Sequence, residues 1–127
     1  MKLLLDTHTF LWFIDDSPQL SRRAKALLES DNDLLLSIAN LWEIAIKHRL
    51  NKLTLPAAYD VFIPQQVAVN DIEILPISMS HLAAVSILPL HHRDPFDRLL
   101  IAQAQVECIA VVSVDTAFDA YSVQRLW

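Results

Sequence analysis

The sequence predicts an α/β fold, in which strands and helices alternate around a mainly parallel sheet. Short apolar runs recur along the chain, and most are followed by a longer segment whose apolar residues have helical spacing. The chain has 127 residues, of which 54% are hydrophobic, and no internal repeat or linker-like segment interrupts it. We therefore expect a single domain over residues 1–127 that buries its own core.

The first half of the chain is expected to contain two buried strands, each followed by a helix. Residues 2–6 form the first strand, because three consecutive leucines are typical of a strand with both faces covered. A short helix over residues 7–14 follows, and Ser21 is a suitable N-cap for the next helix. Residues 34–38 form the second strand, and residues 40–50 form the helix after it.

The middle of the chain is predicted to contain a helix over residues 57–69, which Pro64 should kink or split. Residues 72–77 form a third strand, and the proline in this strand places it at the edge of the sheet. Either Ser78 or Ser80 caps the short helix that follows.

The last third of the chain starts with a strong helix signal. Asp94 stands at the N-cap and Pro95 at the first helical position, where the missing amide hydrogen of proline has no cost. This helix runs to about residue 107 and is apolar nearly all round, so we expect it to be central. Residues 109–114 form the fourth strand, and residues 123–126 are candidates for a fifth.

The composition excludes several classes of protein. The chain contains no glycine, so it cannot contain a Walker loop, a dinucleotide-binding fingerprint or a kinase-type glycine-rich lid. Its net charge of −5 argues against nonspecific coating of nucleic acid, although local basic groups could still hold a strand. Charged residues break every apolar run before it reaches the roughly 20 residues of a membrane span, so we expect no membrane partner.

Cys108 is the only cysteine of the chain. A single cysteine excludes an intramolecular disulfide and fits a reducing cytoplasmic location. Because its neighbours are apolar and it lies near a helix end, we expect the side chain to be buried.

Two aspartates follow apolar strands. Asp6 comes after Lys-Leu-Leu-Leu, and Asp115 comes after Val-Val-Ser-Val. In a parallel sheet the carboxyl ends of the strands share one edge, where ligands bind. Each aspartate could instead cap the helix that follows it, so neither one alone identifies a site.

Three further acids lie near the starts of helices. Glu43 could form an exposed pair with Lys47, but its neighbour Trp42 favours a largely buried helix start. Asp97 could stabilise the start of its helix, yet it lies on the face that we expect to pack. Asp94 is chiefly the N-cap, and contact with metal or a bound water is the alternative.

Four of these acids are candidates for one site, namely Asp6, Glu43, Asp97 and Asp115. If they converge, they cannot all remain ionised without a compensating cation. Hard oxygen ligands and the lack of a cysteine pair favour Mg²⁺, with Mn²⁺ as a substitute, over zinc. The adjacent residues His91 and His92 are expected to lie in a solvated loop.

Four segments of the chain form a distinctive set: Leu-Leu-Leu-Asp-Thr-His-Thr-Phe-Leu-Trp at 3–12, Leu-Trp-Glu-Ile-Ala-Ile-Lys at 41–47, His-Arg-Asp-Pro-Phe-Asp-Arg-Leu-Leu-Ile-Ala-Gln-Ala at 92–104, and Val-Ser-Val-Asp at 112–115. The set spans nearly the whole chain and resembles the PIN-domain ribonucleases, specifically the VapC-type toxins of bacterial toxin–antitoxin pairs. The third segment is the most specific of the four.

This resemblance implies a three-layer α/β/α sandwich around a mainly parallel sheet of about four to five strands. It places the acidic quartet of the family on Asp6, Glu43, Asp97 and Asp115, with Asp6 and Asp97 at the positions most often credited with direct metal contact. It also implies a homodimer and a cognate antitoxin protein, the tail of which occupies or blocks the active site.

The sequence therefore favours a metal-dependent endoribonuclease that hydrolyses RNA phosphodiesters. Asp6, Asp97 and Asp115 would hold one or two metal ions, and Glu43 would bind through water or orient the nucleophile. Candidates for phosphate contacts, which could equally be surface charges or partners of the acids, are Lys47, Arg93 and Arg98.

Two other functions stay open. A PIN-like module could bind protein or RNA without catalysis, its acids serving as helix caps and ion-pair partners. A haloacid dehalogenase-like phosphatase would use Asp6 as a nucleophile, but such enzymes have a second aspartate where this short chain has His8. Trp12 and Phe13 could form a partner surface, although core packing is the default expectation for both.

Overall fold

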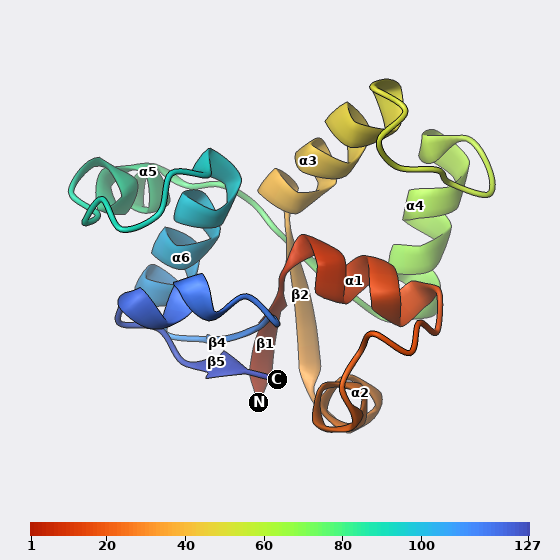
Figure 1. Ribbon diagram of the computed structural model, residues 1–127, viewed down its shortest axis with the longest axis horizontal. Helices are drawn as coiled ribbons and strands as arrows, with labels where there is room; N and C mark the ends of the chain where they lie inside the picture. Colours follow the sequence, from red (N-terminus) through yellow and green to blue (C-terminus); the bar gives the residue numbers. More distant parts are fainter.

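Five strands form one sheet in the order β3-β2-β1-β4-β5 in the computed structural model, which describes residues 1–127 (Figure 1). Every neighbouring pair of strands is parallel. The strands are β1 (Lys2–Leu5), β2 (Asp33–Ser37), β3 (Glu73–Leu75), β4 (Ala110–Val112) and β5 (Arg125–Leu126). The predicted parallel α/β fold is confirmed, as are the fifth strand and the edge position of the third.

Six α-helices and one 3₁₀ helix cover this sheet. They are α1 (Thr7–Ile14), α2 (Arg22–Glu29), α3 (Ile38–Arg49), α4 (Tyr59–Val69), α5 (Met79–Ser86), α6 (Pro95–Glu107) and the 3₁₀ helix η1 (Thr116–Ala120). Figure 1 shows α5 and α6 on one side of the strands and α1, α2 and α4 on the other, so the molecule has three layers. None of the helices combines the length and the apolar character that crossing a membrane requires.

The two faces of the sheet carry separate cores because side chains alternate along each strand. Leu3 and Leu5 of β1 point into the core that contains Phe10 of α1 and Ile63 of α4. Leu4, between them, points into the second core, which α6 supplies with Leu100, Ile101 and Ala104. Three leucines in succession are therefore all buried, as expected for a central strand of a parallel sheet.

Helix caps account for most differences between the expected and the observed boundaries. The helix α3 begins at Ile38, two residues before the expected start, because the Ser37 hydroxyl accepts a hydrogen bond from the Ala39 amide and Asn40 caps in return. Pro64 lies inside α4 without splitting it. Ser78, rather than Ser80, caps α5.

Two expectations about burial are wrong. Cys108 is exposed, because it ends α6 in the left-handed conformation at φ 56° and turns its side chain away from the core. Trp42 is 60% exposed and packs edge-on against Phe96, although other residues of the same helix, including Ile44, are buried. Trp12 and Phe13 are partly buried against the first core, as expected by default.

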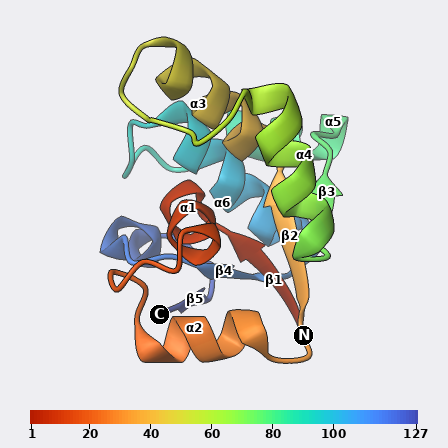
Figure 2. The ribbon, with the colours of Figure 1, turned by 90° about the vertical axis from the view of Figure 1, so that its right-hand side faces the viewer.

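The strand order places one crevice at the carboxyl edge of the sheet. From β1 the chain proceeds outward to β2 and β3, and then returns to the other side of β1 to form β4 and β5. The segments after β1 and β4 therefore leave on opposite faces, which is the arrangement in which open α/β sheets bind ligands. In Figure 2, α3 lies at this end of the strands, and the N-terminus and α2 lie at the other.

Candidate metal centre

Asp6 lies directly after β1 and is 7% exposed. Its Oδ1 accepts a hydrogen bond of 2.7 Å from the Thr7 amide at the start of α1, and its Oδ2 accepts one of 2.8 Å from the Ser113 hydroxyl. Burial raises the pKa of Asp6 above its usual value, and the two hydrogen bonds oppose this shift only in part. Asp6 therefore caps α1, and its carboxylate also lies in the candidate site, so a role as helix cap does not exclude a role as metal ligand.

Glu43 reaches the same edge from α3 and is tied to α1. Its Oε1 accepts a hydrogen bond of 2.6 Å from the hydroxyl of Thr7, and Thr7 in turn accepts one of 2.8 Å from the buried side chain of Asn40. Its Oε2 lies 3.0 Å from Nζ of Lys47, one helical turn further on. The expected pair with Lys47 therefore exists, but the Glu43 carboxylate itself is only 12% exposed.

Asp97 and Asp94 belong to the first turn of α6. Asp94 is the N-cap, since its Oδ1 accepts hydrogen bonds from the amides of Phe96 and Asp97 at 2.9 and 3.1 Å. This cap fixes the direction of the first turn, which holds the Asp97 carboxylate at the carboxyl edge with 19% of its side chain exposed.

Asp115 completes the set from the segment that follows β4. The strand ends at Val112, so Ser113 and Val114 separate Asp115 from the sheet. The Ser113 hydroxyl accepts a hydrogen bond of 3.0 Å from the Asp115 amide while it donates to Asp6. Ser113 therefore joins the two aspartates. Asp115 also caps η1 and is the most exposed acid of the four, at 43% of its side chain.

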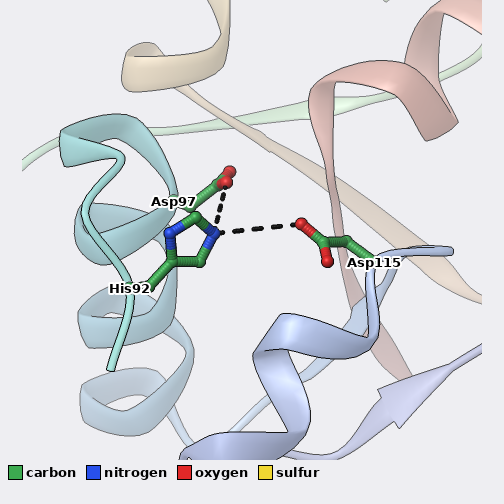
Figure 3. Close-up of side chains that lie close together, drawn as sticks. All are labelled: His92, Asp97 and Asp115. Atoms are coloured by element: carbon green, nitrogen blue, oxygen red, sulfur yellow. Dashed lines mark ion pairs between the residues drawn. The ribbon is translucent and has the colours of Figure 1, made fainter. Parts of the chain in front are cut away.

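His92 lies in the candidate site, so the expectation of a solvated loop is wrong for this residue. Its ring is 17% exposed, and Nε2 lies 3.0 Å from an Asp97 oxygen and 3.8 Å from an Asp115 oxygen (Figure 3). His91 is exposed and packs edge-on against the ring of Tyr121. The adjacent histidines therefore point in different directions, and only the second reaches the acids.

The acids act together on Asp97. Its pKa is raised to about 8, first by burial and then by repulsion from Asp6, Asp94, Glu43 and Asp115. Three carboxylates from other segments of the chain, together with Asp94 of the same segment, are thus close enough to influence one group. This is the electrostatic signature expected of a cluster that binds a cation.

The donor set fits a divalent cation. Atoms of His92, Asp97 and Asp115 lie within 4.8 Å of one another, so the three side chains border the same small space, and two of them supply carboxylate oxygens. Nε2 of His92 is buried next to the acids and has no hydrogen-bond partner, which marks a position where a further group belongs. Carboxylate oxygens are the ligands that Mg²⁺ and Mn²⁺ prefer.

Three polar residues that hold the site together had no place in the sequence analysis: Thr7, Asn40 and Ser113. Ser113 had a usable signal, because it is the single polar residue within the last apolar run. Thr7 and Asn40 had none, since a threonine and an asparagine near helix starts are ordinary cap residues.

The basic candidates for phosphate contacts divide into three cases. Arg98 is occupied by the chain, because its guanidinium donates to the carbonyl oxygens of Leu88, Pro89 and His92. Lys47 pairs with Glu43 beside the acids. Arg93 is exposed near the site.

The fold and the site define the class of protein. The PIN domain family model matches residues 3–124, which is nearly the whole chain. The chain belongs to the PIN domain family, and the expected family is confirmed. None of the proteins with curated descriptions matches it in sequence.

The fold is similar to that of several solved structures, one of which is described as a toxin–antitoxin complex. VapBC2 from Rickettsia felis, bound to a DNA fragment from its promoter, matches with a TM-score of 0.75 and 16% identity over 99% of this chain and 98% of that one. FitAcB from Neisseria gonorrhoeae matches with a TM-score of 0.65 and 22% identity over 98% and 96%. A toxin–antitoxin complex from Klebsiella pneumoniae matches with a TM-score of 0.66 and 17% identity, also over 98% and 96%.

Proposed function

We propose that this chain is a metal-dependent endoribonuclease, the VapC-type toxin of a type II toxin–antitoxin pair. The observation that carries the proposal is the convergence of acids from four segments on one edge of the sheet, where burial and then the neighbouring carboxylates raise the pKa of Asp97 to about 8. A cluster that resists ionisation in this way is stabilised by a divalent cation. Membership of the PIN domain family and the likeness in fold to the toxin–antitoxin complexes support the same function.

The proposed cation is Mg²⁺, with Mn²⁺ as a substitute, held by Asp6, Asp97 and Asp115, and by Glu43 through water. When bound, it would lower the pKa of a water molecule and stabilise the charge that develops on a phosphodiester. The chain orients these ligands beforehand: Ser113 holds Asp6, and Thr7 holds Glu43. RNA phosphodiesters are the proposed substrate.

Cleavage of structured RNA by the purified protein tests this function. Wild-type protein with Mn²⁺ should cut RNA, and Asp6→Asn and Asp97→Asn should each lower the rate by about a hundredfold or more, since each removes a metal ligand. Asp33→Asn is the matched control, because Asp33 begins β2 at the opposite edge of the sheet. Equal cleavage by all four proteins would indicate a contaminating nuclease and refute the proposal.

Titration calorimetry with Mn²⁺ separates an enzyme from a non-catalytic binding module. The nuclease hypothesis predicts one or two saturable sites that Asp6→Asn weakens sharply. A protein whose acids serve only as caps and ion-pair partners would show no saturable site, and its RNA binding would not depend on metal.

We propose a cognate antitoxin protein as the partner of this chain. A groove of ≈ 390 Å³ lies between α1 and the segment after α3, and Lys47, which pairs with Glu43, is part of its lining. The lining also includes Trp12, Lys52 and one acid, Asp15. A lining that is largely apolar, with two lysines against one acid, suits an acidic, amphipathic tail. Coexpression with the product of the neighbouring gene should give a stable complex that no longer cuts RNA. Lys52→Glu should weaken that complex, and an unaltered affinity would place the tail elsewhere.

We further propose a homodimer in the cytoplasm. The exposed face of α5 and the segment after it carry four large apolar side chains, Met79, Leu82, Ile87 and Leu90. Several exposed large apolar side chains on one short stretch of the chain often mark a protein interface. A reducing cytoplasm would keep the exposed thiol of Cys108 free.

A further inference from the structure

The orientation of the His92 ring is set by the backbone around it. The amide of His92 donates to the hydroxyl of Tyr121 at 2.7 Å, and its carbonyl oxygen accepts from Arg98 at 3.3 Å. The Tyr121 hydroxyl donates in turn to the carbonyl oxygen of Pro89 at 2.8 Å. The segment before α6 is therefore pinned at several points, and the ring has a defined place beside the acids.

The amide of Asp94 decides which ring nitrogen of His92 carries the hydrogen. This amide donates to Nδ1 of His92 at 3.2 Å, so Nδ1 must present a lone pair. In a neutral ring the hydrogen then lies on Nε2, which is the nitrogen that faces Asp97 and Asp115 (Figure 3). A nitrogen that carries a hydrogen cannot coordinate a metal ion, so His92 is not a metal ligand in this arrangement.

The Nε2–H group of His92 is a buried donor without an acceptor. The nearest carboxylate oxygen, from Asp97, is 3.0 Å away but does not lie in the direction of a hydrogen bond. A buried donor that stays unpaired costs roughly 1–3 kcal/mol, so an arrangement of this kind is expected where a ligand supplies the acceptor.

We infer that Nε2–H of His92 donates a hydrogen bond to a non-bridging oxygen of the phosphodiester bound at this site. The inference rests on the proposed nuclease function and adds a substrate-binding residue to it. A water molecule on a metal ion turns its hydrogens outward and so suits the surrounding carboxylates rather than a second donor. A phosphate oxygen is a negatively charged acceptor, and an acceptor is the partner that the Nε2–H group lacks.

A ring N–H donor suits this position better than a lysine or an arginine would. A lysine or arginine between Asp97 and Asp115 would pair with both carboxylates and take the place of the metal ion. The Nε2–H group of His92 can instead donate to a phosphate oxygen while the acids stay free for the cation. It thereby provides a contact that the net negative charge of the cluster would otherwise oppose.

Nitrogen NMR on protein with ¹⁵N-labelled histidine tests the tautomer and the contact directly, without turnover. Long-range ¹H–¹⁵N correlations should show a hydrogen on Nε2 of His92 and none on Nδ1, both without metal and with Mg²⁺. Addition of inorganic phosphate to the Mg²⁺ form should shift the Nε2–H resonance and leave His91 unchanged. Hydrogen on Nδ1, or no response to phosphate, would overturn the inference.

Metal binding and kinetics distinguish a donor from a ligand. Mn²⁺ affinity, measured by electron paramagnetic resonance, should change less than about threefold in His92→Gln and His92→Leu, and the bound Mn²⁺ should show no coupling to a nitrogen nucleus. kcat/KM for RNA should fall by about 10- to 100-fold in His92→Leu, as expected for one hydrogen bond to a charged group. His92→Gln should lose much less activity than His92→Leu, because the side-chain amide of glutamine can still donate a hydrogen bond. His91→Leu is the matched control.

The outcomes separate this inference from the proposed function. Nitrogen coupling to Mn²⁺, together with a tenfold loss of metal affinity in His92→Leu, would make His92 a metal ligand and leave the nuclease function intact. A wild-type protein that never cuts RNA but shifts Nε2–H with Mg²⁺ and phosphate would refute the nuclease function and leave the phosphate contact standing.

Discussion

At the scale of single residues, Asp97 is the group on which the whole site acts. It starts the buried face of α6, and the surrounding carboxylates together with burial raise its pKa to about 8. Without metal, Asp97 is therefore mostly protonated at neutral pH. Metal binding requires the carboxylate, so binding and deprotonation are linked.

Proton release should accompany metal binding. Between about pH 6 and 7, Mn²⁺ must displace the Asp97 proton, so close to one proton should leave for each ion bound, and fewer should leave above pH 8. Metal affinity should accordingly rise with pH and level off near 8. Calorimetry in two buffers with different ionisation enthalpies measures the proton count. A count of zero at pH 6.5 would show that Asp97 is already ionised.

The free energy of unfolding of the metal-free protein should depend on Asp97 in a defined direction. Its carboxyl has a higher pKa in the folded state than the unfolded value of 3.8, so folding favours the protonated form. The contribution to stability is fully present below about pH 4 and is lost as the pH rises toward 8. Asp97→Asn should remove this loss of stability at high pH, because an asparagine side chain does not ionise.

Urea unfolding in EDTA checks this direction. At pH 8.5 we expect Asp97→Asn to be more stable than wild type by a few kcal/mol, and at pH 4 we expect the two to be nearly equal. Added Mn²⁺ should stabilise wild type but not the variant. The control is Asp33→Asn, which lies at the other edge of the sheet. If Asp97→Asn is less stable than wild type at pH 8.5, the ionised Asp97 carboxylate is not destabilised by burial and by its neighbouring carboxylates, and the prediction fails.

At the scale of elements, hydrogen bonds between neighbouring segments determine where each acid lies. Thr7, the first residue of α1, joins Glu43 and Asn40 of α3. Ser113, after β4, joins Asp6 to the segment that carries Asp115. The carboxyl edge is thus cross-linked by hydroxyl groups before any metal binds, which keeps the acids in place against their repulsion.

Removal of the Thr7 hydroxyl should loosen the contact between α1 and α3. Thr7→Val removes the acceptor of the buried Asn40 NH₂ group and the donor to Oε1 of Glu43, so we expect a loss of about 1–3 kcal/mol in the free energy of unfolding. Thr7→Ser keeps the hydroxyl and should stay within about 1 kcal/mol of wild type. Chemical denaturation of both variants measures the difference. Equal losses would mean that the methyl group, rather than the hydroxyl, carries the effect.

At the scale of the whole molecule, the sheet and the surface have separate roles. The order β3-β2-β1-β4-β5 opens a crevice at the carboxyl edge, and the outer face of α5 leaves a row of apolar side chains exposed. The crevice contains the candidate site, and the outer face of α5 is the surface we propose for the homodimer.

Charged substitutions on α5 should shift the chain from dimer to monomer. Met79 and Leu82 are both exposed, so the Met79→Lys, Leu82→Lys double variant should fold normally while it places charges in the proposed interface. Sedimentation velocity should show a dimer for wild type and a monomer for the variant at the same concentration. The control is Val69→Lys, an exposed position on α4. A variant that remains dimeric would place the interface elsewhere.

The sequence by itself determined the parallel α/β fold and the positions of the four acids along the chain. A run such as Leu3 to Leu5 favours a buried strand, and Asp94 with Pro95 favours a helix start, because local sterics and solvation act within a few residues. The acids could be found for a similar local reason, because Asp6 and Asp115 follow strands and Asp97 lies in the first turn of a helix. Glu43 lies further into its helix, and the PIN-type segment around it indicated its role.

Only the tertiary structure decided how those acids are held and which neighbours join them. His92 reaches Asp97 and Asp115 because Tyr121 and Arg98 pin its backbone, and these residues lie far from it in sequence or on the following helix. Cys108 is exposed because of the left-handed end of α6, not because of its apolar neighbours. Long-range contacts and single backbone angles of this kind leave no periodic pattern in a sequence, whereas burial of strands and capping of helices do.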